Sequence, residues 1–337
     1  MLDWRKLAIL SDGELSRLDT AAVNMACAAG LPDAPTEAQI LECLDRLDHY
    51  ARSAEDYSHR RMPEFARQPE TYDRSEPIFR VVCMVTLLQR QFGVLYNQEK
   101  KPDSASLDTT DAFIHGALIG SGGTCASLPV VYVAVGRRLG YPMKLVQARG
   151  HLFCRWDDGT EQRFNIEVND TGTSSPPDYY YRSGRYELSP AIEKQTIFLK
   201  SQTPRQELAG FLANRGHRWL DLGRNREAAE SFVWASTLAP AHKLHEFDAV
   251  TALTRWRDHL RQMTPPNFPS LQVNMPSVRR YPAIPVAVEA DMIRFEVWEK
   301  VLQNLEGQHR VMGPMRSSTS AAGPANTLRK IVVDVTR

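Results

Sequence analysis

A cysteine follows a glycine-rich turn near the middle of the chain. Gly122, Gly123 and Thr124 precede Cys125, and the apolar residues after it predict a helix over 125–139. The first turn of a helix has unpaired N–H groups and partial positive charge, which stabilise a thiolate and can hold an oxyanion. The glycines would let a substrate backbone come close. Cys125 is thus a candidate nucleophile; the alternative is that it is a buried packing residue, as free cysteines commonly are.

A histidine and an acid follow on two predicted strands. His151 begins a strand over 151–156, and Glu167 lies near the end of a second strand over 161–168, with Asp158-Gly159 as the hairpin turn. Pairing of these strands would bring the two side chains together. His151 would take the thiol proton, and the acid or an amide would fix the imidazole tautomer. The other polar residues that compete for this third role are Asn165, Asn169 and Asp170.

Further residues could line a cleft around this constellation. His115 precedes Cys125 by ten residues, and packing or capping of a helix is its alternative role. Gly123 and Thr124 flank the cysteine, and Tyr179 opens a run of three tyrosines that could wall the cleft or pack within a loop. No paired spacing of cysteines or histidines favours a metal, so we expect neither a metal nor another cofactor.

The elements around these residues predict an α+β fold. Its core is a cysteine-bearing helix on a small antiparallel sheet of three strands, the first over 143–148. Before it, Ser11, Thr36 and Ser75 are predicted helix N-caps. A loop rich in Pro, Ser, Tyr and Gly is expected over 171–187. The predicted parts are helices over 1–100, the core over 101–200, helices over 204–263, a Pro-rich linker over 264–286, a helix over 287–309 and a largely disordered tail over 310–337.

The helices after the core contain one match to a tetratricopeptide-type repeat, over residues 209–242. Small residues at its close-packing positions would let two helices approach, and two aromatic residues would fill the seam between them. Because a solenoid usually needs about three repeats, this one is expected to dock on the preceding domain or on degenerate neighbours. The marker residues are Gly216, Trp219, Gly223, Ala228, Phe232, Ala235 and Pro240.

Charge and composition exclude several function classes. The 337 residues carry 41 Lys+Arg and 40 Asp+Glu, a net charge of +1. General nucleic-acid or anionic-membrane binding needs a basic surplus, so neither partner is expected. No apolar run approaches the ~20 residues of a spanning helix, and we expect no signal peptide. The five cysteines are odd in number and lie far apart, as is typical of a reduced, cytoplasmic protein.

The sequence resembles the transglutaminase-like superfamily of cysteine proteases, in the bacterial branch with a helical N-terminal segment and a tetratricopeptide-like C-terminal region. The resemblance covers about residues 75–240. It implies that Cys125 is the nucleophile and His151 the base, with Glu167 where the superfamily usually has Asp. The chemistry it implies is acyl transfer through a thioester. The residues that carry it lie in Asp111–Leu118, Gly123–Leu128, Val131–Gly140 and Gly150–Phe153.

Two functional hypotheses follow. The first is a cysteine-dependent peptidase, amidase or transglutaminase-type enzyme that acts on a peptide or amide substrate through a Cys-His-acid triad. The second is a non-catalytic scaffold that keeps the fold and binds a protein partner through the helical repeat. The two can hold together if the repeat recruits substrate to the cleft. Thiol reactivity separates them, since a lone thiol has a pKa of ~8.5 and an activated one reacts well below that pH.

Overall fold

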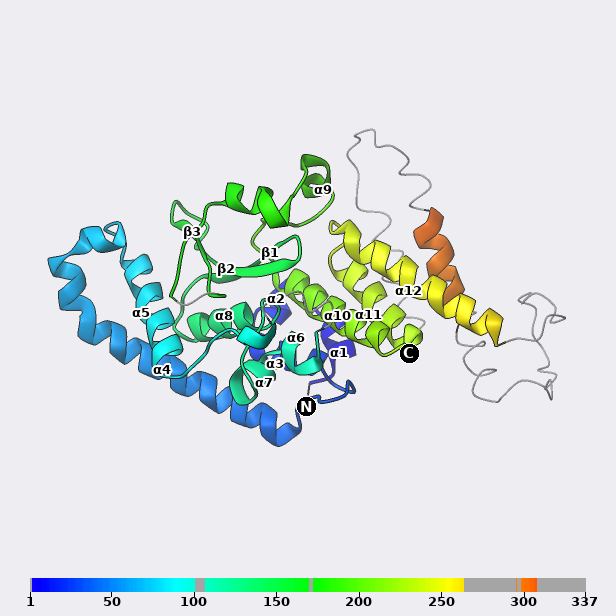
Figure 1. Cartoon of the computed structure of the whole chain (residues 1–337), viewed down its shortest axis with the longest axis horizontal. Helices are drawn as coiled ribbons and strands as arrows, with labels where there is room; N and C mark the ends of the chain where they lie inside the picture. The colour runs from blue at the N-terminus through cyan, green and yellow to red at the C-terminus, as the bar shows by residue number, and fades with distance from the viewer. Residues whose placement is uncertain (1, 101–106, 170–171, 264–294, 296–297, 308–337) are drawn as a thin grey trace. The chain divides into compact units, whose positions relative to one another are not determined.

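The computed structural model describes residues 2–100, 107–169, 172–263, 295 and 298–307 (Figure 1). It contains two compact units, Met1–Arg218 and Trp219–Arg337. The predicted linker over 264–286 and the tail over 310–337 lie outside the described residues. No helix in the described ranges is both long and apolar enough to cross a membrane.

Helices occupy most of the first hundred residues, and their starts are fixed by side-chain caps. Ser11 and Thr36 form capping boxes with Glu14 and Gln39, and the Ser75 hydroxyl accepts the N–H of Ile78, which confirms the three predicted caps. The helix that starts after Ser11 is only one turn long. The α-helices of this region are α1 (Trp4–Ala8), α2 (Asp12–Leu15), α3 (Thr20–Cys27), α4 (Glu37–Arg67) and α5 (Glu76–Arg90), with the short 3-10 helices η1 (Pro69–Tyr72) and η2 (Gln98–Lys100).

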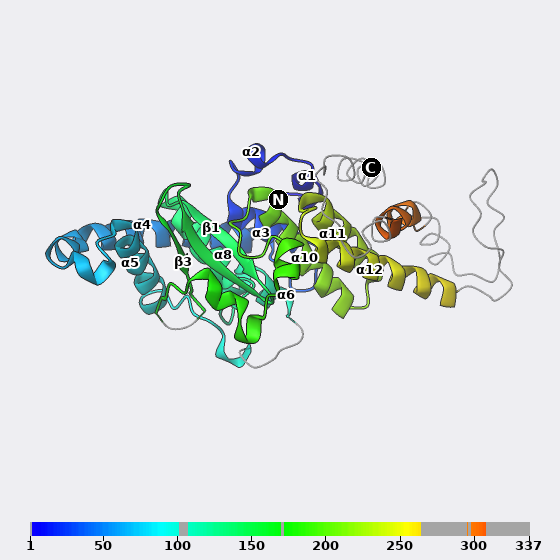
Figure 2. The same cartoon turned by 90° about the horizontal axis from the view of Figure 1, so that it is seen from above.

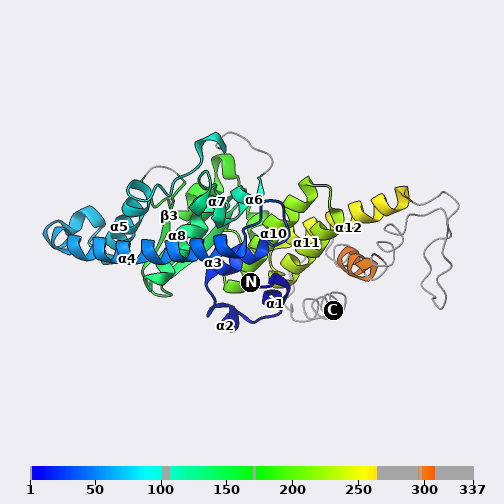
Figure 3. The ribbon, with the colours of Figure 1, turned by 90° about the horizontal axis from the view of Figure 1, so that it is seen from below.

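A buried helix forms the centre of the first unit. After the short helices α6 (Thr109–Ala112) and α7 (Ile114–Ile119), helix α8 spans Leu128–Arg138, and nine of its eleven residues are buried. The long helix α4 packs against α5, α7 and α8, and Figure 3 shows it running beneath them. A helix that is apolar most of the way round needs cover on all sides. Helix α8 gets that cover from helices on one side and from the sheet on the other.

Three antiparallel strands make the sheet, in the order β1-β2-β3 (Figure 1), and Figure 2 shows the sheet from above, over α8. They are β1 (Met143–Ala148), β2 (His151–Asp157) and β3 (Arg163–Ile166), so β1 is confirmed to the residue and β3 is shorter than predicted. The thiol of Cys154 donates to the Pro129 carbonyl of α8, 3.2 Å away. Because side chains alternate along a strand, His151 and Phe153 face the opposite side of the sheet.

The side of the sheet that bears His151 is covered by residues 177–201, which we call the covering segment. It contains η3 (Asp178–Arg182), η4 (Gly184–Tyr186) and α9 (Pro190–Lys194), and Figure 1 shows it across the sheet from α8. The surface loop predicted over 171–187 is largely confirmed, since most of its described residues are exposed, but it contains two 3-10 helices and buries Tyr181 and Tyr186. Aromatic and aliphatic residues of this segment are buried against Val146, Ala148 and Phe153, and they are Tyr181, Tyr186, Leu188, Phe198 and Leu199.

The remaining helices follow the covering segment. Helix α10 (Pro204–Asp221) contains the boundary between the units, and α11 (Asn225–Leu238) packs against α12 (Lys243–Gln262) in the second unit. Of the helix predicted over 287–309, the structure describes residue 295 and residues 298–307, all helical. Phe295 packs edge-on against Trp256 of α12, with ring centroids 5.0 Å apart.

Candidate active site

The turn before α8 holds Cys125. The Thr124 carbonyl accepts the N–H groups of Ser127 and Leu128, at 3.3 and 2.9 Å, and the Thr124 hydroxyl donates to the Asp111 carbonyl at 2.8 Å. The helix therefore begins at Leu128, three residues later than predicted, and Cys125 lies in the turn that leads into it. Cys125 is half-buried, whereas the other four cysteines are buried. It is thus the most accessible thiol of the five.

The glycines before the cysteine serve the protein's own packing. Gly123 donates its N–H to the Leu95 carbonyl at 3.0 Å and accepts the Asn97 N–H at 2.8 Å. A Cβ at Gly123 would lie 2.9 Å from Leu128 Cδ1, and Gly122 has a φ of 110°. The two glycines therefore let residues 95–97 pair with the turn that bears Cys125, and their admission of a substrate backbone stays a prediction.

His151 pairs with Glu167. The Nε2 atom of His151 lies 2.7 Å from Oε2 of Glu167; His151 is buried and the Glu167 side chain is 12% exposed. Burial by itself would lower the pKa of His151, but the hydrogen bonds that the ring makes with the Cys125 thiol and the Glu167 carboxylate outweigh burial and raise the pKa to about 9. Since Glu167 occupies Nε2, Nδ1 is the ring atom left for the thiol. The structure thus brings together the three residues that the sequence singles out.

Glu167 is held by donors on both carboxylate oxygens. Oε2 accepts the Tyr181 hydroxyl at 3.2 Å besides His151, and Oε1 accepts the N–H of Val168 and the side-chain amide of Asn169 at 3.1 and 2.6 Å. Burial would raise the pKa of Glu167, but the hydrogen bonds with His151 and Asn169 outweigh burial and lower it. The carboxylate therefore stays charged at neutral pH and can orient the imidazole.

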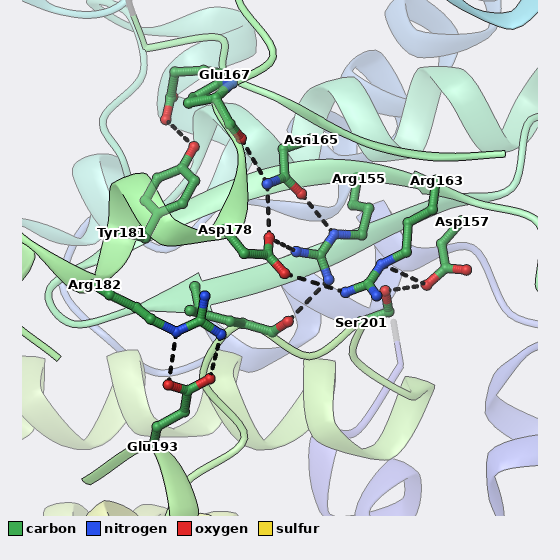
Figure 4. Close-up of polar contacts among 12 residues, drawn as sticks. Arg155, Asp157, Arg163, Asn165, Glu167, Asp178, Tyr181, Arg182, Glu193 and Ser201 are labelled. Carbon is green, nitrogen blue, oxygen red and sulfur yellow. Dashed lines mark hydrogen bonds and ion pairs between the residues drawn. The ribbon is translucent and has the colours of Figure 1, made fainter. Parts of the chain in front are cut away.

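The other candidates for the third position have different places. Asn169 lies behind Glu167 and donates to its carboxylate. Asn165 lies on β3 opposite Arg155 and is engaged elsewhere: its side chain accepts from Arg155 Nε at 2.7 Å and donates to Asp178 and to the Pro176 carbonyl, both at 2.8 Å (Figure 4). Asp170 lies outside the described residues.

A buried arginine anchors the covering segment to the sheet. Arg155 is fully buried, and besides Asn165 its guanidinium binds Asp178 at 2.5 Å and the Leu199 carbonyl at 3.0 Å. Asp178 is the first residue of η3, the 3-10 helix that contains Tyr181. Figure 4 shows this cluster beside the contact between Glu167 and Tyr181. The Arg155 cluster therefore fixes the element that presents the Tyr181 hydroxyl to the Glu167 carboxylate.

Tyrosines enclose the histidine and the cysteine. The rings of Tyr186 and Tyr181 lie 5.1 and 6.0 Å from the His151 ring, centroid to centroid. The Tyr96 hydroxyl is hydrogen-bonded to Cys125, and burial, together with the nearby thiol, raises the pKa of Tyr96. Sequence reasoning missed Tyr96, for which no local motif gives a signal, whereas Tyr181 lies within the tyrosine run that the sequence singled out.

The residues expected to line a cleft are mostly engaged inside the protein. His115 is buried with its Nε2 3.0 Å from the Asp33 carbonyl oxygen, and burial lowers its pKa. Thr124 is fully buried, and Gly123 is packed against Leu128. Tyr179 is 72% exposed, so it is not a packing residue of its loop. Among the described residues, no group of three or more His, Cys, Asp or Glu is placed to hold a metal ion.

Comparison with known proteins gives one match. Residues 42–212 match the family model of the transglutaminase-like superfamily, which is half of the chain and reaches from α4 through the sheet into α10. The chain therefore belongs to the transglutaminase-like superfamily. The small antiparallel sheet packed on α8 fits the α+β core expected of it. No curated protein and no solved structure matches the chain.

Proposed function

We propose that this protein is a cysteine-dependent acyl-transfer enzyme that acts on a peptide or amide substrate. The observation that carries the proposal is the pairing of His151 with Glu167 at 2.7 Å beside the Cys125 thiol. A buried imidazole held by a charged carboxylate on one nitrogen and a thiol on the other is the arrangement that nucleophilic cysteine catalysis needs. Membership of the transglutaminase-like superfamily supports the same chemistry.

The reaction proceeds in two half-reactions. The Cys125 proton passes to His151, and the thiolate sulfur forms a bond with the acyl carbon of the substrate. The tetrahedral intermediate then expels the amine, which takes the proton from His151 as the C–N bond breaks, and a thioester remains on Cys125. Water or a second amine attacks the thioester, His151 takes its proton, and the thiol is released. Glu167 keeps the imidazole oriented and stabilises its cationic form.

We propose two hydrogen-bond donors for the oxyanion. The backbone N–H of Cys125 is the first, and the Tyr96 hydroxyl, which already hydrogen-bonds Cys125, is the second. The backbone pairing of Leu95 and Asn97 with Gly123 holds Tyr96 at this place. Hydrogen bonds to a developing oxyanion are worth about 2.7–4 kcal/mol each in well-studied enzymes.

The proposal is tested with p-nitrophenyl acetate as an activated acyl donor. We expect an initial burst of nitrophenolate and an acetyl group on the peptide that contains Cys125, read by mass spectrometry. Cys125→Ala should remove the burst, and His151→Ala should slow it by roughly 10²–10⁴-fold because the general base is lost. The four buried cysteines in the same digest serve as internal controls.

Equal acetylation of all cysteines, or a burst that His151→Ala leaves unchanged, would contradict the enzymatic proposal. The scaffold hypothesis would then take its place, and it can be examined by partner binding to Cys125→Ala. Thermal unfolding of each variant shows whether a lost burst reflects chemistry or folding.

We also propose that the helices over 204–263, with their tetratricopeptide-like pattern at 209–242, bind the protein substrate or a partner, and that the protein acts in the cytoplasm of a bacterium. The pattern residues Trp219, Ala228, Phe232 and Ala235 are buried, which supports their role as packing residues of helices. Loss of protein-substrate turnover on mutating exposed α12 residues, with p-nitrophenyl acetate turnover kept, would test the recruiting role.

A further inference from the structure

An arginine lies at the edge of the site on the covering segment. Nη2 of Arg185 donates to the Tyr186 hydroxyl at 2.6 Å, and its guanidinium carbon lies 4.8 Å from the Tyr186 ring centroid. The Tyr186 ring in turn lies 5.1 Å from the ring of His151. Burial raises the pKa of Tyr96, and the positive charge of Arg185 opposes that rise. Arg185 therefore acts electrostatically on groups that touch both His151 and Cys125.

A second arginine contacts the covering segment from the turn between β1 and β2. Arg149 lies two residues before His151, is exposed, and donates from Nη1 to the backbone carbonyl of Glu187 at 3.2 Å. Glu187 is two residues after Arg185, so both guanidinium groups belong to one short stretch of surface beside the histidine. In the part of the chain that the structure describes, neither guanidinium forms an ion pair with Glu187 or with another carboxylate.

Within the described residues, two nearby arginines, unlike Arg149 and Arg185, form ion pairs with carboxylates. Arg182, three residues before Arg185, is paired with Glu193 through two hydrogen bonds of 2.9 and 2.6 Å. Arg155 is paired with Asp178. A guanidinium has five N–H donors, and Arg185 and Arg149 each use one in their contacts with Tyr186 and Glu187. Their remaining donors and their charge are available to a bound molecule.

We propose that Arg185, with support from Arg149, binds a carboxylate of the acyl donor close to the scissile carbonyl, so that the enzyme prefers acidic peptide substrates. The inference rests on the proposed function, because it names the substrate class of the same site. The planar guanidinium matches a carboxylate with two parallel hydrogen bonds. Its stacking on Tyr186 fixes its plane before binding, which reduces the rotamer entropy lost on association.

The protein's own carboxylate at the site does not compete for this role. Glu167 is the acid nearest to the histidine, and its two oxygens already accept hydrogen bonds from His151, Tyr181 and Asn169. Its charge is balanced by the imidazolium, whose pKa is raised to about 9. Since no carboxylate of the described residues forms an ion pair with Arg149 or Arg185, these two cations favour an anionic substrate group.

The test compares two alkylating reagents of nearly equal size, anionic iodoacetate and neutral iodoacetamide. Each reacts as the Cys125 sulfur forms a C–S bond and iodide leaves, and mass spectrometry gives the rate at Cys125. The ratio of the iodoacetate rate to the iodoacetamide rate should fall by roughly two- to six-fold in Arg185→Gln, as expected for unit charges on the order of 8 Å apart at a partly hydrated site. Arg149→Gln should lower it less.

Arg182→Gln is the matched control, since its charge is already compensated by Glu193, and its ratio should equal that of the wild type. Arg185→Lys should keep part of the effect because the charge remains. At about 1 M salt, where the Debye length is ~3 Å, the difference between wild type and Arg185→Gln should shrink.

The outcomes separate this inference from the proposed function. If Cys125 reacts faster than the buried cysteines but its reagent ratio is the same in wild type and Arg185→Gln, the substrate preference is refuted and the enzymatic proposal stands. If Cys125 reacts no faster than the buried cysteines with either reagent, both proposals are overturned. An equal fall in Arg182→Gln would also refute the specific role of Arg185.

Discussion

Replacing Glu167 with Gln tests the physical origin of the raised pKa of His151. The variant keeps the shape of the side chain and removes its charge. The side chains of His151 and Glu167 are only 5% and 12% exposed, so solvent screens their interaction little. A hydrogen bond to a charged group contributes about 1.5–3 kcal/mol, and 1.36 kcal/mol corresponds to one pH unit, so the pKa of His151 should fall from about 9 by roughly 1 to 2 pH units.

The assay is an NMR pH titration of the imidazole signals, with the His151 resonance assigned from its loss in His151→Gln. Glu187→Gln, which removes an exposed carboxylate from the covering segment, serves as the control and should leave the His151 midpoint in place. Tyr181→Phe keeps the charge of Glu167 and should change the midpoint less than Glu167→Gln does. A His151 midpoint that stays at its wild-type value in Glu167→Gln would show that the Glu167 carboxylate is not what raises the pKa.

Three further predictions concern stability. His151 has a folded pKa of about 9, above its ordinary value of 6.5. Its contribution of about 3 kcal/mol to the free energy of unfolding should therefore be complete below pH 6.5 and lost as the pH rises to 9. The difference in urea-unfolding free energy between wild type and His151→Gln should shrink between pH 6.5 and 9, and a constant difference would contradict this prediction. Asp178→Asn leaves the buried Arg155 charge without its carboxylate and should cost about 1–3 kcal/mol in the same assay; an unchanged stability would show that the ion pair is dispensable. Gly123→Ala places a Cβ 2.9 Å from Leu128 and should cost about 1–3 kcal/mol, with a lower melting temperature as the readout and an unchanged one as the contrary result.

Local patterns in the sequence predicted the elements that carry Cys125, His151 and Glu167. Strand β1 was correct to the residue because its bounds follow from alternation and flanking turns, and the Asp158-Gly159 turn fixed the pairing of β2 with β3. That pairing is what brings Glu167 to His151. The helix start was placed three residues early because a Cys-Ala-Ser turn and a first helical turn look alike in a sequence.

Local sequence patterns could not predict the contacts between segments that lie far apart in the chain. Tyr96 reaches Cys125 because residues 95–97 pair with Gly123 in a strand-like manner, and no residue pattern in either segment predicts this pairing. The run of three tyrosines drew attention to the covering segment, although its composition favoured a loop. Only the packing in the structure shows that the Tyr181 side chain is buried and that of Tyr179 is exposed. His115 is buried, in line with the packing role that the sequence offered for it, but its contact with the Asp33 carbonyl, 82 positions away, could not be read from a local pattern.

The pairing of residues 95–97 with Gly123 bears on how the part of this chain around Cys125 can be divided. Leu95, Tyr96 and Asn97 come shortly after helix α5, which ends at Arg90 and packs against α4 and α8. A shortened protein that began at residue 101 would keep Cys125, His151 and Glu167 yet lose the backbone partner of the Cys125 turn and the hydroxyl beside its thiol. Any shortened version meant to keep this site intact must therefore include α4, α5 and the residues that follow them.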